Sequence, residues 1–201
     1  MKIKTLHYSL LIVTVLLFCC TNKTVNKKEL SVILNDSAIS LYYHSDDFTN
    51  VIILLDSAIK LNPKYYTAYW NLIAIQNSAG KKSEAFKTVK KMSDNFPLNP
   101  DILSLKGIYY EIFGDSINAV LSYQKADKRY KYLLDSLTVE SKSYQSVVMN
   151  YALNLKLLHE EDKANETLFE LRQKIDDEIV KQAIDSFYIN KKREDLFEMY
   201  K

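Results

Sequence analysis

The middle of the sequence repeats every 34 residues, and this period restricts the fold more than any other feature. Segment 46–79 aligns with the two segments that follow it, and Asp46, Gly80 and Gly114 each stand at a turn between segments whose apolar residues recur three and four apart. Other sets keep the same spacing: Val51, Ala85 and Ala119; Leu55, Val89 and Tyr123; Ala58, Met92 and Ala126; Pro63 and Pro97. One helical hairpin cannot bury its apolar face alone, so the period predicts three or more stacked hairpins. A generic helical bundle is the alternative.

Glycine and proline are scarce, with three of each in 201 residues. A fold with many tight turns needs more of both, so the long uninterrupted segments favour an all-α protein. Hydrophobic residues make up 47% and charged residues 26% of the chain, a balance typical of a chain that buries a core. The length predicts one compact unit.

The segment 105–115 is the clearest copy of the repeat. Leu105, Gly107 and Tyr110 supply an apolar, a small and an aromatic residue on a first helix, and Gly114 makes the turn. This pattern resembles the tetratricopeptide repeat, whose second helix carries an alanine and ends near a proline. The resemblance implies a right-handed superhelical stack of antiparallel helix pairs, in which small residues let two helices approach closely.

The resemblance is strong over residues 46–126 and loose over residues 28–175. Lys131 replaces the closing proline of the third repeat, which predicts that its second helix continues through Tyr130 and Leu133. A fourth hairpin is expected from residues 144–158, a turn at 159–163 and a helix from Ala164, 45 residues after Ala119. An amphipathic helix at 179–188 and a short one at 196–200 are expected to cap the array. Residues 29–201 would then form a domain of about 3 to 4 repeats and capping helices.

The first twenty residues are typical of a secretory signal. Lys2 and Lys4 precede the run 10–20, which is apolar except for Thr14. A membrane-spanning helix needs about 20 apolar residues, and this run has about half that number. We therefore expect a cleaved signal and no permanent span.

The end of the run, residues 16–20, resembles the lipobox of bacterial lipoproteins. The resemblance implies that Cys20 is lipidated, with Leu17 and Cys19 in the flanking positions, although Phe18 and Cys19 are larger than the usual residues. Residues 1–19 would be the signal peptide and residues 20–28 the lipidated cysteine and its tether. The mature protein would be a cell-envelope lipoprotein on the periplasmic side of the outer membrane, because Thr21 rather than aspartate follows the cysteine. A plain cleaved signal with chance cysteines is the alternative.

Charge and motif content argue against several functions. Cleavage after Cys19 removes two lysines and no acid, so 27 basic residues become 25 and balance the 25 acidic residues. Nucleic-acid binding normally requires a basic face, and we expect none. Residues 159–162, beginning with His159, contain possible metal ligands, but adjacent side chains on a turn diverge, which favours a solvated loop. No phosphate-binding loop or nucleophile motif is present, so we expect no cofactor, no metal, no catalytic residue and no enzyme.

The resemblance also implies a concave groove lined by the first helix of each hairpin. Carried across the repeats, it places these residues on or near the groove: Tyr43, His44, Trp70, Ala74, Asn77, Ile108, Glu111 and Ile112. Trp70 adjoins Tyr69, and one of the two should face the groove; packing of Trp70 between repeats is the alternative. Asn71 matches one residue of the carboxylate clamp of some family members, but the other clamp residues are missing.

The sequence therefore predicts a membrane-tethered scaffold that binds a protein or peptide in this groove. Trp70, Ile108 and Ile112 would be apolar anchors, and Asn77 and Glu111 would add polar selectivity. A different class is glycan binding, in which Trp70 and Tyr43 would stack on sugar rings.

Overall fold

The structure is a computed structural model that describes residues 26–45, 47–139, 141–198 and 200. The expected signal peptide, the lipidated Cys20 and the tether up to residue 25 lie outside the described residues. Every regular element in the described part of the chain is a helix. The predicted all-α class is therefore confirmed.

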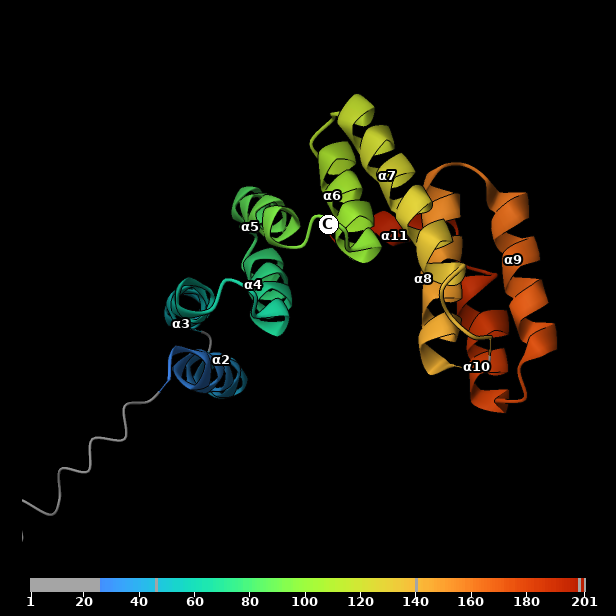
Figure 1. The fold of residues 1–201 in the computed structure, drawn as a ribbon. Coiled ribbons are helices and arrows are strands. Elements are labelled where there is room, and N and C mark those ends of the chain that lie inside the picture. The colour runs from blue at the N-terminus through green and yellow to red at the C-terminus, as the bar shows by residue number, and fades with distance from the viewer. Residues whose placement is uncertain (1–25, 46, 140, 199, 201) are drawn as a thin grey trace, which may run out of the picture.

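Eight of these helices form four antiparallel pairs that stack in chain order (Figure 1). The pairs are α2 (Lys27–His44) with α3 (Phe48–Leu61), α4 (Tyr66–Ser78) with α5 (Lys82–Asn95), α6 (Pro100–Ile112) with α7 (Ser116–Leu134), and α8 (Lys142–Leu157) with α9 (Glu161–Lys174). Each pair also contacts the next one, through α3 with α4, α5 with α6, and α7 with α8. The tetratricopeptide-like stack predicted from the period is confirmed, including the long second helix of the third pair.

The turns inside the pairs use a left-handed residue. Gly80 and Gly114 have φ angles of 70° and 80°, and His159 has a φ of 62° at the corresponding place in the fourth pair. Histidine is among the few residues other than glycine that enter this region with some frequency. The turn expected at 159–163 ends earlier, because α9 already begins at Glu161. The equivalence of His159 with Gly114 can be read from the sequence, because the two residues are separated by the same 45 residues as Ala119 and Ala164.

Aspartates that begin the second helices explain where those helices start. Asp47 Oδ1 accepts a hydrogen bond from the Asn50 backbone N–H at 3.0 Å, and Asp115 Oδ1 accepts one from that of Asn118 at 3.1 Å. Both carboxylates also accept from the asparagine side chain, at 2.5 and 2.7 Å. These bonds satisfy N–H groups that have no partner inside a helix. They also hold the pKa values of Asp47 and Asp115 below the usual range.

The repeat positions are buried as the register predicts. Ala85, Ala119 and Ala164 are at most 1% exposed, and so are the larger residues four positions later, Val89, Tyr123 and Leu168. Small side chains let the paired helices approach, and large ones fill the space between them. The step from Ala119 to Ala164 is 11 residues longer than the 34-residue period, because α7, the connection after it and α8 are all longer than α5, the connection 96–99 and α6.

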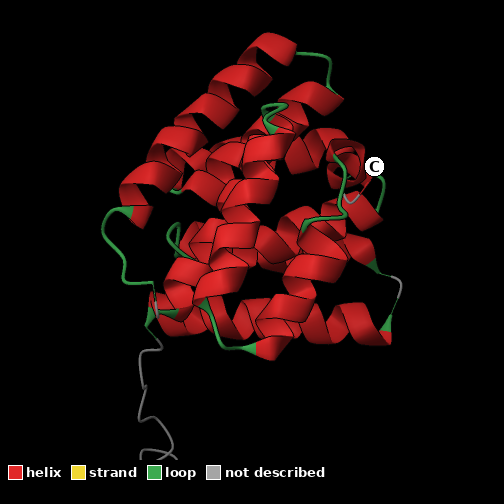
Figure 2. Ribbon diagram, turned by 90° about the vertical axis from the view of Figure 1, so that its right-hand side faces the viewer, coloured by secondary structure: helices red, strands yellow, loops and turns green. Residues whose placement is uncertain are grey.

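After the fourth pair the chain forms α10 (Glu178–Ala183), the π-helix η1 (Ile184–Tyr188) and α11 (Arg193–Glu198). Ile184 and Tyr188 belong to one hydrophobic cluster with Leu155 and Leu168, so this segment covers the end of the stack, as expected of a cap. The chain then turns away from the end, and α11 lies beside α6 and α8 near the middle of the molecule in the view of Figure 1. Figure 2 shows that helices joined by short loops make up the described residues. No helix among the described residues combines the length and the apolar character needed to cross a bilayer.

Candidate functional site

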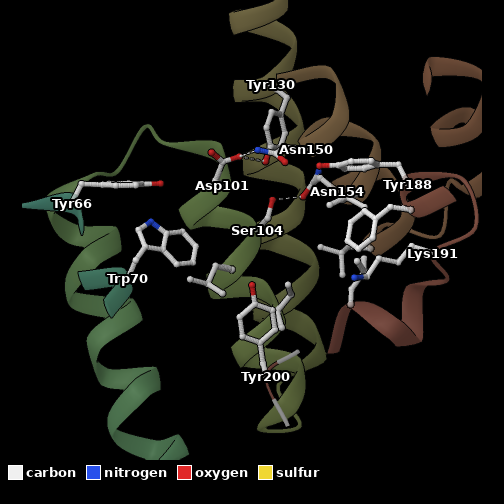
Figure 3. A pocket seen from close by; sticks show the side chains of 16 residues that line it. Tyr66, Trp70, Asp101, Ser104, Tyr130, Asn150, Asn154, Tyr188, Lys191 and Tyr200 are labelled. Carbon is white, nitrogen blue, oxygen red and sulfur yellow. Dashed lines mark hydrogen bonds between the residues drawn. The ribbon is translucent and has the colours of Figure 1, made fainter. Parts of the chain in front are cut away.

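A cavity of about 340 Å³ lies on the face formed by α4, α6 and α8, the first helices of three successive pairs. We call this surface the inner face. The end of η1 and the chain after it border the cavity on the opposite side (Figure 3). Its lining consists of Tyr66, Trp70, Asp101, Ser104, Leu105, Ile108, Tyr130, Asn150, Leu153, Asn154, Leu157, Phe187, Tyr188, Lys191, Leu196 and Tyr200. The site thus combines an apolar floor with aromatic and polar walls, a common composition of binding pockets.

Aromatic rings from α4 form one wall. Tyr66 and Trp70 are one helical turn apart, and their ring centroids are 6.0 Å apart in an edge-to-face arrangement. The Phe96 ring packs edge-to-face against the Tyr66 ring, with ring centroids 5.5 Å apart. Both wall residues are partly buried, and burial raises the pKa of Tyr66. Packing of this kind restricts side-chain motion, so the wall is arranged before any ligand arrives.

A hydrogen-bond network from α6, α7 and α8 forms the polar wall. Asp101 Oδ1 accepts from the Tyr130 hydroxyl at 2.6 Å and from Asn150 Nδ2 at 3.1 Å. Burial raises the pKa of Tyr130 well above its usual value, and the nearby Asp101 carboxylate raises it further. The negative charge of Asp101 is thereby held at the edge of the cavity.

A second pair of polar groups lies deeper. The Ser104 hydroxyl donates to Asn154 Oδ1 at 2.7 Å, and Asn154 Nδ2 donates to the Tyr123 carbonyl at 3.1 Å. Asn154 is completely buried. Satisfied polar groups of this kind fix the position of α8 against α6 and α7, because an unpaired buried amide would be costly.

Lys156 fastens the chain that closes the cavity. Its side chain is 0% exposed, and Nζ donates to the carbonyls of Tyr188, Ile189 and Lys191 at 2.9, 2.9 and 2.7 Å. These carbonyls lie at the last residue of η1 and just after it, where a helix end leaves acceptors unpaired and attracts a cation. Burial lowers the pKa of Lys156, and Glu161, 3.9 Å away, counteracts this effect.

Arg193 joins α11 to the inner face. Its Nη2 donates to both carboxylate oxygens of Glu111, at 2.6 and 2.7 Å, and its Nε donates to the Leu157 carbonyl at 3.3 Å. Glu111 also accepts from the Tyr123 hydroxyl at 3.1 Å. The ion pair is partly buried, with 17% of the Arg193 side chain and 26% of the Glu111 side chain exposed. It is therefore less screened by solvent than a surface pair.

The residues predicted for the groove divide into two sets. Trp70 and Ile108 line the cavity, and Glu111 and Ile112 border a second hollow of about 240 Å³ beside α11. The other four do not line either hollow. Asn77 is hydrogen-bonded to the Tyr109 hydroxyl, Ala74 is exposed on α4, and Tyr43 and His44 are exposed at the end of α2.

Several lining residues were not singled out from the sequence. Asp101 and Tyr200 line the cavity, Arg193 borders the second hollow, and Lys156 holds the turn after η1, but no motif in the sequence marks any of the four as a site residue. One signal was present: Arg193, Leu196, Phe197 and Tyr200 lie three, four and seven residues apart, on one side of a helix. That pattern predicts a buried face and does not say against which surface it packs.

Within the part of the chain that the structure describes, no three His, Cys, Asp or Glu side chains are grouped as metal ligands would be. Asp101 and Glu111 accept hydrogen bonds from neighbouring side chains, and Lys156 donates to carbonyls. The cavity offers aromatic faces, apolar surface and the Asp101 carboxylate to a ligand, whereas Glu111 is paired with Arg193.

The buried tyrosines predict loss of the fold at high pH. Burial raises the pKa of Tyr109 to about 12 and also raises the pKa values of Tyr66 and Tyr200. Because these values lie above the unfolded value of about 10, the stabilisation is complete below pH 10 and is lost as the pH rises through about 12. Tyrosinate absorbance and helical circular dichroism, titrated together, should change in the same range.

Tyr109→Phe should move this transition to higher pH, whereas Tyr43→Phe, at an exposed tyrosine, should leave it unchanged. Full tyrosinate formation with the circular dichroism intact would contradict the burial of these hydroxyls.

Comparison with known proteins adds two solved structures of similar fold. The first is MamA residues 41 to the end from Desulfovibrio magneticus RS-1, with 14% identity, a TM-score of 0.43, and coverage of 71% of this chain and 74% of that one. The second is described as a crystal structure of MamA protein, with 14% identity, a TM-score of 0.44, and coverage of 85% and 92%. Neither likeness carries information about a binding site. No family model matches the chain, and no curated protein matches it.

Proposed function

We propose that this protein is a non-catalytic interaction scaffold that binds a segment of another protein on its inner face. The observation that carries the proposal is the cavity beside Trp70, which opens on the first helices of three successive pairs. A stack of helix pairs offers one continuous surface made by equivalent helices, which suits an extended or helical segment. Trp70 and Ile108 are the apolar anchors, and Asp101 and Glu111 add negative charge.

Crosslinking in native membranes tests the proposal. A photoreactive amino acid at Ala74, exposed one helical turn after Trp70, should capture partner proteins. Trp70→Ala should remove most of these adducts, because it deletes the largest side chain of the aromatic wall. Tyr132→Ala is the matched control, since Tyr132 is 61% exposed and does not line the cavity. An unchanged set of adducts with Trp70→Ala would count against the site.

Glycan binding is the second candidate function, and the Tyr66–Trp70 wall favours it. Two aromatic rings 6.0 Å apart beside Asp101 and Asn150 are the combination of stacking faces and hydrogen-bonding groups that a sugar ring requires. The sequence suggested Tyr43 as the partner of Trp70, but Tyr43 does not line the cavity. Its ring packs against that of Tyr42, with ring centroids 5.6 Å apart. Trp70 is the only tryptophan of the chain, so its fluorescence reports directly on the cavity. An envelope-glycan array without binding, and no change in emission, would eliminate this candidate.

We further propose that lipid on Cys20 holds the protein on a membrane of the cell envelope, on the periplasmic side of the outer membrane. The support is the signal-like sequence of residues 1–19 and the lipobox-like ending at Cys20. The helical part begins at Lys27, close after this cysteine, so the scaffold would stay near the membrane surface.

Cys20→Ala should abolish acylation, whereas Cys19→Ala should preserve it, because alanine is a usual residue before the lipidated cysteine. Intact mass of the membrane-extracted protein and its partition into detergent measure the result. A mature mass without a lipid adduct, or a protein that keeps Met1, would contradict the lipid anchor.

A further inference from the structure

The C-terminal segment of this chain occupies part of the inner face on which we place the partner. Lys156 holds the turn after η1 through three carbonyls, and this turn directs α11 back over α6 and α8. Figure 3 shows Tyr200 on one side of the cavity and Lys191 on another, with Trp70 across from Lys191. The chain thus places one of its own helices where the proposed function places a ligand.

The contacts of α11 resemble those of a bound peptide. Leu196 and Phe197, 5% and 9% exposed, are buried in one cluster with Ile108 and Leu157. The Tyr200 ring lies 5.8 Å from that of Tyr109, and burial raises the pKa of Tyr200. Arg193 adds the charged contact to Glu111. Helix-in-groove recognition uses this arrangement, in which anchors three, four and seven residues apart enter one surface.

The contact between α11 and the inner face is weak. Helix α11 has only six residues, and a helix of that length does not persist in water without tertiary contacts. Glu194 and Asp195 remain exposed, and the hollow bordered by Glu111, Ile112, Glu194 and Phe197 leaves room beside α11. Terminal elements with few buried residues open at low free energy. A competing segment can therefore replace α11 without unfolding the stack.

We infer that the site under α11 binds a helical segment of the partner and that α11 competes with this segment within the same chain. The segment carries an arginine or lysine, apolar residues three and four positions after it, and an aromatic residue seven positions after it. The inference rests on the proposed function and specifies its partner. Glu111 selects the cation, and the cluster around Ile108 and Leu157 receives the apolar residues. Since α11 is covalently attached, a free ligand binds only after it is displaced, which weakens the apparent affinity.

The test uses the full chain in detergent and a synthetic peptide with the sequence of residues 190–201, labelled with a fluorophore. Leu196→Ala with Phe197→Ala removes the anchors of α11 and leaves the inner face intact. This variant should bind the peptide at least about tenfold more tightly than the wild type does, by fluorescence anisotropy and by the emission of Trp70. A peptide with Arg193→Glu is the matched control and should bind at least about tenfold more weakly.

Glu111→Gln in the same variant should weaken binding of the original peptide by about tenfold and reduce the difference between the two peptides. Equal binding of both peptides to the double variant, or no binding of either, overturns the inference. A dimer of the double variant in analytical ultracentrifugation would also overturn it, in favour of α11 exchange between two copies.

If the double variant loses its helical circular dichroism, Arg193→Ala alone replaces it. This variant should also bind the peptide more tightly than the wild type does. The crosslinking experiment at Ala74 tests the scaffold function independently of these peptide-binding measurements. Adducts that depend on Trp70 together with a failed peptide experiment would retain the scaffold and reject this partner.

Discussion

Lys156→Met lowers the free energy of unfolding by about 3 kcal/mol, because three partly buried carbonyls lose a charged donor that methionine cannot replace. Methionine keeps a similar length and apolar stem, so the expected loss comes from the ammonium and not from a cavity. The end of η1 should separate from α8, and α11 should follow it. Chemical denaturation followed by circular dichroism measures the first effect, and protease cleavage between residues 184 and 200 measures the second.

Lys163→Met is the matched control for this substitution. The Lys163 side chain is 46% exposed and pairs with Glu160 at 2.8 Å, and the substitution should change stability by less than about 0.5 kcal/mol. Equal stabilities of Lys156→Met and the wild type would mean that the three carbonyls are satisfied without Lys156.

Gly107→Ala destabilises the third helix pair by about 3 kcal/mol, the upper part of the range for overpacking a core. A Cβ at Gly107 would overlap Cε1 of Tyr123 and lie 2.6 Å from its Cδ1. Tyr123 is 0% exposed, so its ring cannot move aside without displacing α6 from α7. At an exposed helix position the same substitution would stabilise by about 1 kcal/mol, so the expected sign is opposite to that of helix propensity. Thermal and denaturant unfolding measure it.

Tyr123→Val supplies the control for Gly107→Ala, because valine has no atoms where the ring meets the new Cβ. The cost of Gly107→Ala should fall to about 1 kcal/mol or less in the Tyr123→Val background. A cost that is the same in both backgrounds would show that the overlap with Tyr123 is not its cause.

Both substitutions act on the inner face as well as on stability. Lys156→Met loosens the turn that brings α11 to Glu111, so it should increase peptide binding as the α11 variant does. Gly107→Ala shifts α6, which carries Ile108 and Glu111, and should weaken binding to the same surface.

Much of the fold was predictable because its determinants are local and periodic. The sequence shows Gly80 and Gly114 at the turns, Ala85 and Ala119 where helices cross, and the absence of a proline that lets α7 continue to Leu134. Each of these features acts on residues a few positions away, and the 34-residue period repeats the signal. The fourth pair was harder to predict because 11 extra residues, spread over α7, the connection after it and α8, break the 34-residue spacing.

The site was predictable in part. The register placed Trp70 and Ile108 on one face, and the structure brings both to the cavity. It also placed Tyr43 and Asn77 near that face, but the exposure of Tyr43 and the bond of Asn77 to Tyr109 depend on how the neighbouring pairs pack.

By itself, the sequence of this protein determined the helices, their pairing and which side of each helix is buried, because hydrophobic period, capping residues and small residues operate within one pair or between neighbours. Only the tertiary structure decided where the C-terminal segment lies. The Arg193–Glu111 pair spans 82 residues, and Lys156 reaches carbonyls 32 to 35 residues away. Such contacts depend on how all the intervening helices are arranged in space. No residue pattern in α11 specifies which surface of the stack this arrangement places beside it.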